Sequence, residues 1–121
     1  MRYGIVCFVA SLFALQGIEA RADDRVDGAY FRVMNFYGTL MVYAEACNLE
    51  TRYDLKAEAL NQMPSEVNIV SMELDLDRAF SDERGRSGTV DCDPKLAKMY
   101  AGMFSRSMDD LVEAVNTRTN P

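Results

Sequence analysis

The stretch AYFRVMNFYGTLMVYAEAC, residues 29–47, decides the fold. Apolar side chains recur in it every three or four residues, which is the spacing of one face of an α-helix. Further aromatic and aliphatic residues widen this face, and a helix that is apolar over most of its circumference belongs in a protein core. We therefore predict that these residues form the central helix of a bundle. The predicted apolar face consists of Tyr30, Val33, Met34, Tyr37, Leu40, Met41, Ala44 and Cys47.

Gly38 stands in the middle of this predicted helix. A glycine there costs about 1 kcal/mol relative to alanine, so we expect a neighbouring helix to approach closely at this point in compensation. The helix is too short for a membrane span, because only 12 uncharged residues separate Arg32 from Glu45 and a span needs roughly 20 apolar residues.

A second helix is predicted directly after the first. Asn48 suits the left-handed residue that ends many helices. Thr51-x-x-Asp54 then resembles a capping box. It would open a helix over residues 51–63, which Pro64 ends because proline cannot continue a helix.

Residues 65–80 fit two patterns. Met72 and Leu76 are spaced as on one face of a helix, whereas Met72, Leu74 and Leu76 also alternate as in a strand. A lone strand would have nothing to pair with, and the sequence offers no second strand candidate. We therefore predict a third helix, with Ser65 as its N-cap.

The last predicted helix follows the main loop of the chain. Residues 81–93 are rich in glycine, serine and charged residues, a composition typical of loops. Asp93 and Pro94 are suited to the N-cap and the first position of a helix. This helix is predicted to end near Val115, followed by a frayed tail at residues 116–121.

The N-terminus has the features of a secretory signal peptide. Arg2 precedes an apolar run at residues 4–15, and Ala20-Arg21-Ala22 is a small-x-small cleavage pattern. An uncleaved membrane anchor is the alternative, but the apolar run is shorter than a bilayer span. We predict that residues 1–22 are cleaved and that the protein is periplasmic or secreted, which places it in an oxidising compartment.

The predicted mature chain, residues 23–121, has the length of a single helical domain. Loss of Arg2, Arg21 and Glu19 leaves 11 basic and 18 acidic side chains, a formal net charge of −7. An acidic chain without a basic run repels nucleic acids and anionic lipids. We therefore expect neither a nucleic-acid partner nor stable membrane insertion after cleavage.

Two cysteines, Cys47 and Cys92, remain once Cys7 is lost with the signal peptide. An even number of cysteines in an exported protein predicts a disulfide. A free or intermolecular thiol and a metal ligand are the alternatives, but the chain contains no histidine, which metal sites and activated cysteines commonly use. The sequence thus predicts an all-α protein: a small four-helix bundle stapled by one disulfide.

The sequence offers no motif for catalysis, for a cofactor or for a metal, so we expect a protein that is not an enzyme. The remaining interpretation is a module that binds an envelope or secreted protein, of the immunity, inhibitor or envelope-accessory type. Tyr43 and Tyr53 are candidate contacts with the partner, because tyrosine is enriched at interfaces. An acid-responsive periplasmic chaperone and a binder of a small apolar ligand are the alternatives.

Overall fold

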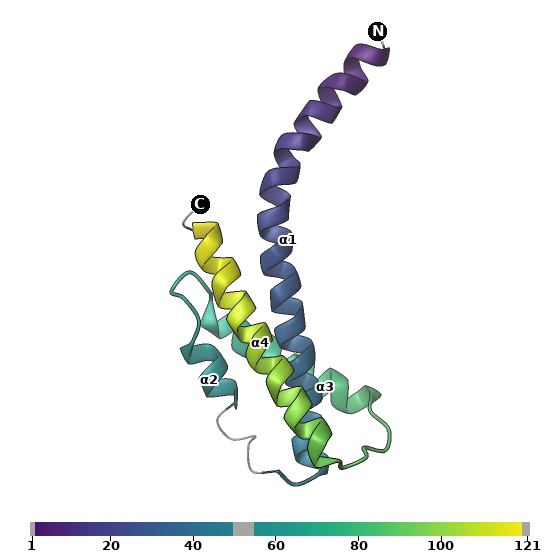
Figure 1. Cartoon of the computed structure of the whole chain (residues 1–121), viewed down its shortest axis with the longest axis vertical. Coiled ribbons are helices and arrows are strands. Elements are labelled where there is room, and N and C mark those ends of the chain that lie inside the picture. Colours follow the sequence, from purple (N-terminus) through teal and green to yellow (C-terminus); the bar gives the residue numbers. More distant parts are fainter. Residues whose placement is uncertain (1, 50–54, 120–121) are drawn as a thin grey trace.

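The computed structural model describes the backbone of residues 2–49 and 55–119 and the side chains of residues 24–49 and 55–118. Within these residues the protein is all-helical, with four helices and no strand (Figure 1). This confirms the predicted fold class and the helical assignment of the ambiguous third segment from Ile69 onward. The helices are α1 (Arg2–Ala46), α2 (Leu55–Asn61), α3 (Ile69–Arg86) and α4 (Pro94–Thr119).

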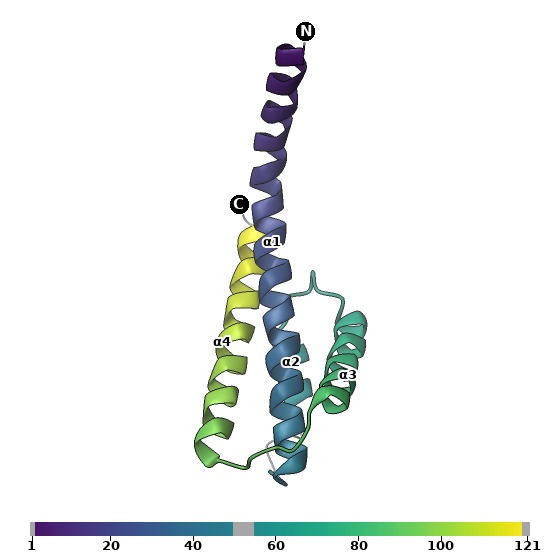
Figure 2. The same cartoon turned by 90° about the vertical axis from the view of Figure 1, so that its right-hand side faces the viewer.

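Helix α1 is the central element, and α4 packs against it in the antiparallel direction (Figure 2). The ring of Tyr37 lies against that of Phe104, and the ring of Tyr43 lies against that of Tyr100. The residue numbers in α1 therefore rise as those in α4 fall, which is the signature of an antiparallel pair.

Helix α3 crosses α1 on another side and follows the same general direction (Figure 1). Tyr30 contacts Asp75, and Glu45 contacts Arg84, so the residue numbers rise together in both helices. The short helix α2 is tied to α3 by Lys56, whose ammonium group lies 3.1 Å from Asp77 Oδ1.

The core lies where these helices meet around α1. Its residues come from all four helices and are fully or almost fully buried, which gives α1 the central place that its broad apolar face predicts. They are Ala29, Val33, Tyr37, Leu40, Ala59, Met72, Leu76, Phe104, Met108, Leu111 and Val115.

The ends of the helices follow the local chemistry of the sequence at three points. Asn48 has a positive φ of 53° after α1, as predicted for a left-handed stop. Asp93 caps α4, because its Oδ1 accepts a hydrogen bond from the Lys95 amide at 3.0 Å. The predicted cap of α3 is wrong: Asn68, rather than Ser65, accepts the Ser71 amide at 3.1 Å.

The main loop is shorter than predicted. Helix α3 continues to Arg86, so the connection to α4 spans residues 87–93 rather than 81–93. The Arg84 guanidinium lies 2.6 Å from Glu45 of α1, and basic residues in the last turn also interact favourably with the helix dipole. Contact with α1 thus supports a helix in residues whose composition predicts a loop.

Helices α1 and α4 also extend beyond their predicted limits. Helix α4 runs to Thr119, so most of the predicted tail at residues 116–121 is helical. Residues 23–28, which precede the first predicted helix and include three aspartates, are also part of α1. Arg25, in the extension of α1, forms an ion pair of 3.4 Å with Glu113 of α4, which gives this extension a neighbour.

The N-terminal part of α1 projects beyond the other helices in both views (Figures 1 and 2). The predicted cleavage after Ala22 falls within this helix and stays a prediction. The predicted capping box from Thr51 to Asp54 lies outside the described residues. Over the part of the chain that was described, none of the helices has the length and hydrophobicity that crossing a membrane requires.

Candidate functional site

The disulfide predicted from the cysteine count is present. Cys47, directly after α1, is bonded to Cys92, which lies two residues before α4, and their Cα atoms are 5.6 Å apart. The bond therefore joins the C-terminal end of α1 to the N-terminal end of α4 and closes one end of the bundle.

The prediction that Tyr43 contacts a partner at the surface is wrong. Its side chain is only 3% exposed, and its hydroxyl donates a hydrogen bond to the backbone carbonyl of Asp93. Burial raises the pKa of this hydroxyl above its usual value of 10. Tyr43 is thus part of the packing that seats the start of α4 on α1. Tyr53, the other candidate contact, lies outside the described residues.

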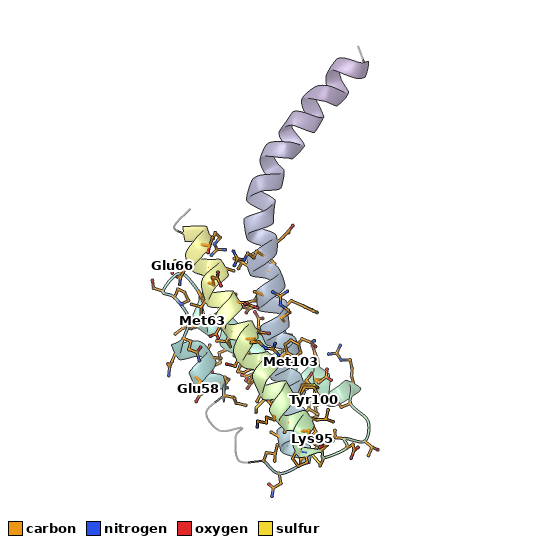
Figure 3. All side chains as sticks on the ribbon, in the orientation of Figure 1. Glu58, Met63, Glu66, Lys95, Tyr100 and Met103 are labelled. Atoms are coloured by element: carbon orange, nitrogen blue, oxygen red, sulfur yellow. A yellow bond between two sulfur atoms is a disulfide. The ribbon has the colours of Figure 1, made fainter. Side chains whose placement is uncertain are left out.

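Six of the seven described methionines are buried or half-buried, and four of them illustrate the range of positions. Met72 and Met108 are buried in the core. Met63 and Met103 are half-buried and belong to different parts of the chain, the turn after α2 and the middle of α4 (Figure 3). These positions fit the use of methionine as a flexible filler of irregular space between helices.

One concave surface is a groove between α1 and α3, with a volume of about 570 Å³. It is open to solvent, and both of its walls carry charged and apolar side chains. The α1 wall consists of Asp27, Tyr30, Phe31, Met34 and Asn35, and the α3 wall consists of Asp75, Arg78, Ala79, Asp82, Glu83 and Arg86. We call this surface the α1–α3 groove.

Gly38 sets the position of the groove. A Cβ atom at Gly38 would lie only 2.8 Å from the carbonyl oxygen of Ala79, which is closer than real Cβ contacts. The backbones of the two helices therefore approach each other directly at this point, as the glycine in the middle of the first predicted helix suggested. Away from the crossing they diverge, and the groove lies in the angle between them.

Tyr30 bridges the two walls of the groove. Its hydroxyl donates a hydrogen bond to the Asp75 carboxylate. Burial raises the pKa of Tyr30 well above 10, and the bond to Asp75 and its negative charge raise it further. The hydroxyl therefore keeps its proton at neutral pH and well above it, so that the hydrogen bond to Asp75 persists into alkaline solution.

Phe31 is the most exposed large apolar side chain of the described residues, at 70% exposure. Its ring stands on the α1 wall beside the half-buried Met34. An aromatic ring at the edge of a concave surface is a typical anchor for a protein partner, because it loses much contact with water and little conformational freedom on binding.

Two other hollows are less suitable as sites. One, of about 640 Å³, lies between the end of α2 and the end of α4, and five of its six lining residues have side chains with polar groups, Val112 being the exception. The other, of about 260 Å³, lies under the loop at residues 87–91. Neither presents an exposed aromatic side chain.

A separate apolar patch lies on the first two turns of α3. Ile69, Val70 and Leu74 are exposed there and do not line the α1–α3 groove. Leu74 follows Val70 by four residues, so these two side chains share one face of the helix. They offer a matched comparison for Phe31, because they are apolar and exposed but stand outside the groove.

Among the described residues, no three acidic or cysteine side chains converge as a metal site would require. Comparison of the whole chain with protein-family models, curated proteins and solved structures found no match. The function proposed below is therefore inferred from the geometry of this chain alone.

Proposed function

We propose that this protein is an exported protein-binding module that acts by contact of the α1–α3 groove with another protein. The observation that carries the proposal is the exposed Phe31 ring beside a groove of about 570 Å³. The groove is held open by fixed points, the close contact at Gly38 and the bond between Tyr30 and Asp75. A surface that is already formed loses little entropy on binding.

The disulfide supports this proposal in a second way. A link between Cys47 and Cys92 restrains the unfolded chain, so a small domain keeps its shape outside the cell without a large core. Such a domain presents its surface in one conformation.

A small apolar ligand is the second candidate for the same groove. The volume of the groove falls within the roughly 300–1,000 Å³ of small-molecule sites. Such sites bury most of their ligand, whereas the open α1–α3 groove leaves one side in solvent, so a protein partner fits it better.

The test is affinity capture from extracellular and envelope extracts, with the tagged, disulfide-bonded chain as bait and mass spectrometry as readout. Three baits are compared: the wild type, Phe31→Ala in the groove, and Leu74→Ala on the outer apolar patch. We expect one stoichiometric partner that the wild type and Leu74→Ala retain and that Phe31→Ala loses.

Other outcomes would contradict the proposal and indicate a different function. A partner retained equally by all three baits would place the contact outside the groove. Capture of many proteins only near pH 3 would indicate the acid-responsive chaperone. No capture at either pH would reject a protein partner, and binding of a small apolar compound by the same bait would then identify the ligand binder.

A further inference from the structure

We propose that the α1–α3 groove binds a basic amphipathic helix of its partner, with the apolar face of that helix against Phe31 and Met34. This inference rests on the proposed function and adds the chemical class of the partner. It follows from the charge, the length and the arrangement of side chains in the groove.

The charge of the groove is negative. Four carboxylates and two guanidinium groups line it, which leaves two net negative charges. Arg86 and Glu83 neutralise each other in an ion pair of 2.8 Å, and Asp75 accepts the hydrogen bond of Tyr30.

Asp27 and Asp82 are the two carboxylates left available to a partner. Both are exposed, and they stand on opposite walls of the groove. No ion pair engages either of them among the described residues. Positive charges on both flanks of a bound helix would complement this pair, and the formal net charge of −6 on the whole chain would attract such a helix from a distance.

The position of Phe31 favours arginine over other cations on the α1 side. Asp27 precedes Phe31 by four residues, so the two side chains are neighbours on one face of α1. A guanidinium group can lie flat on an aromatic ring while it bonds to a carboxylate. The same stacking already exists within this chain, where the Arg84 guanidinium lies 4.3 Å from the centroid of the Phe80 ring.

The length of the groove suits a short helix. Its α3 wall reaches from Asp75 to Arg86, about 17 Å at the 1.5 Å rise of an α-helix. About three turns of a partner helix fill that length, which places two or three apolar residues of one face in contact with the groove. Arg78, the basic side chain on this wall without an ion pair among the described residues, is then available to one acidic residue of the partner.

The test uses two synthetic helical peptides with the same leucine face. One carries arginine on both flanks of that face and the other carries glutamate. Binding to the full, disulfide-bonded chain is measured by calorimetry, and the contact surface is mapped by NMR amide shifts. We expect the arginine peptide to bind at least about tenfold more tightly, with weaker binding at high salt, and to shift the amides of Asp27, Phe31 and Asp82.

Two matched pairs of charge variants distinguish the effect of the groove carboxylates on peptide affinity from the effect of the overall charge of the protein. The pair Asp27→Asn and Asp82→Asn removes the two available carboxylates of the groove. The pair Asp109→Asn and Asp110→Asn removes the same charge from an exposed part of α4. We expect the first pair to weaken the arginine peptide about tenfold and the second to change its affinity less than about twofold.

Equal binding of both peptides, or an equal effect of the two charge pairs, would overturn the inference. So would amide shifts centred on the outer patch at Val70 and Leu74. The proposed function can survive that result, because a folded partner lost by the Phe31→Ala bait would still show that the groove binds protein. If neither the peptides nor the extract gives a Phe31-dependent complex, both proposals fail.

Discussion

The two sides of α1 are built in different ways. Toward α4, α1 presents rings that pack on rings: Tyr37 and Phe104 lie 6.0 Å apart, and Tyr43 and Tyr100 lie 5.8 Å apart. The disulfide closes the end of this side.

Toward α3, the described residues of α1 make three separate contacts in addition to the shared core. Gly38 receives the backbone of α3 at Ala79, and Tyr30 bonds to Asp75. An exposed ion pair joins Glu45 to Arg84. The α4 side is therefore packed ring on ring and closed by a covalent bond, whereas the α3 side leaves the α1–α3 groove beside its points of contact. The comparison predicts that substitutions on the first side affect unfolding most, whereas some on the second affect only binding.

The largest effect is expected from removing the disulfide with Cys47→Ser and Cys92→Ser. The two cysteines are 45 residues apart, and closing a loop of that length stabilises a fold by about 4 kcal/mol through the restricted unfolded chain. Urea unfolding of the oxidised wild type and the double variant measures the difference. A loss below about 1 kcal/mol would show that packing between α1 and α4 suffices without the covalent link.

Gly38→Ala is expected to have the second-largest effect on stability, because the methyl group of the alanine would press on the backbone of α3. The clash outweighs the better helix propensity of alanine and costs about 1–3 kcal/mol net. Gly102→Ala in α4 is the control: a Cβ there meets no atom within 4 Å, so it should stabilise the protein by about 0.5–1 kcal/mol. Thermal unfolding of both variants measures whether stability falls in Gly38→Ala and rises in Gly102→Ala. An equal gain in stability in both would mean that α3 can move away from α1 at the crossing with little cost.

Tyr30→Phe removes the hydrogen bond that spans the groove. We expect a loss of about 1 kcal/mol, within the usual range for a hydrogen bond in a folded protein. A double-mutant cycle with Asp75→Asn isolates the pair, because it subtracts the other effects of each substitution. A coupling energy near zero would show that the two walls are held by apolar contact alone.

Alkaline pH should weaken this bond in the wild type. The pKa of Tyr30 is higher in the folded protein than its unfolded value of 10. The folded protein therefore holds this proton more tightly, and the resulting stability is present below pH 10 and lost as the pH rises toward the folded pKa. The advantage of the wild type over Tyr30→Phe should shrink above pH 10 in urea titrations. A difference that stays constant up to pH 11 would contradict the raised pKa.

Phe31→Ala should change stability least. The ring is 70% exposed, and such surface substitutions usually stay within about 0.5 kcal/mol. Thermal unfolding of this variant should match the wild type while partner capture is lost. A clear loss of stability would instead show that the ring supports the fold, and the comparison between the two sides of α1 would then fail.

The parts of the fold that depend on local chemistry were predictable from the sequence. Gly38 predicted the close approach of a neighbouring helix, Asn48 predicted the left-handed end of α1, and Asp93 was predicted to be the N-cap of α4. The structure confirms all three. Each prediction uses a rule about a single residue and its nearest neighbours. The pairing of Cys47 with Cys92 followed from a count.

The candidate site was not predictable in the same way. Tyr43 is buried because α4 covers it, and nothing in its own stretch of sequence tells that face of α1 from the one that carries Phe31. Residues 81–86 are helical although their composition is typical of loops, and Arg84 in this segment pairs with Glu45 of α1, a contact between parts of the chain that are far apart in the sequence. The groove follows from how two helices cross, which no single segment encodes.

The link between Cys47 and Cys92 also changes what a protease can do to this protein. Helices α2 and α3 and the loop at residues 87–91 lie between the two bonded cysteines. One cut anywhere in that interval opens a ring without releasing a fragment, and α1 and α4 stay joined at the cysteines. A nicked molecule would therefore run as two pieces on a gel only after reduction, and it could keep its packed α1–α4 pair in an environment rich in proteases.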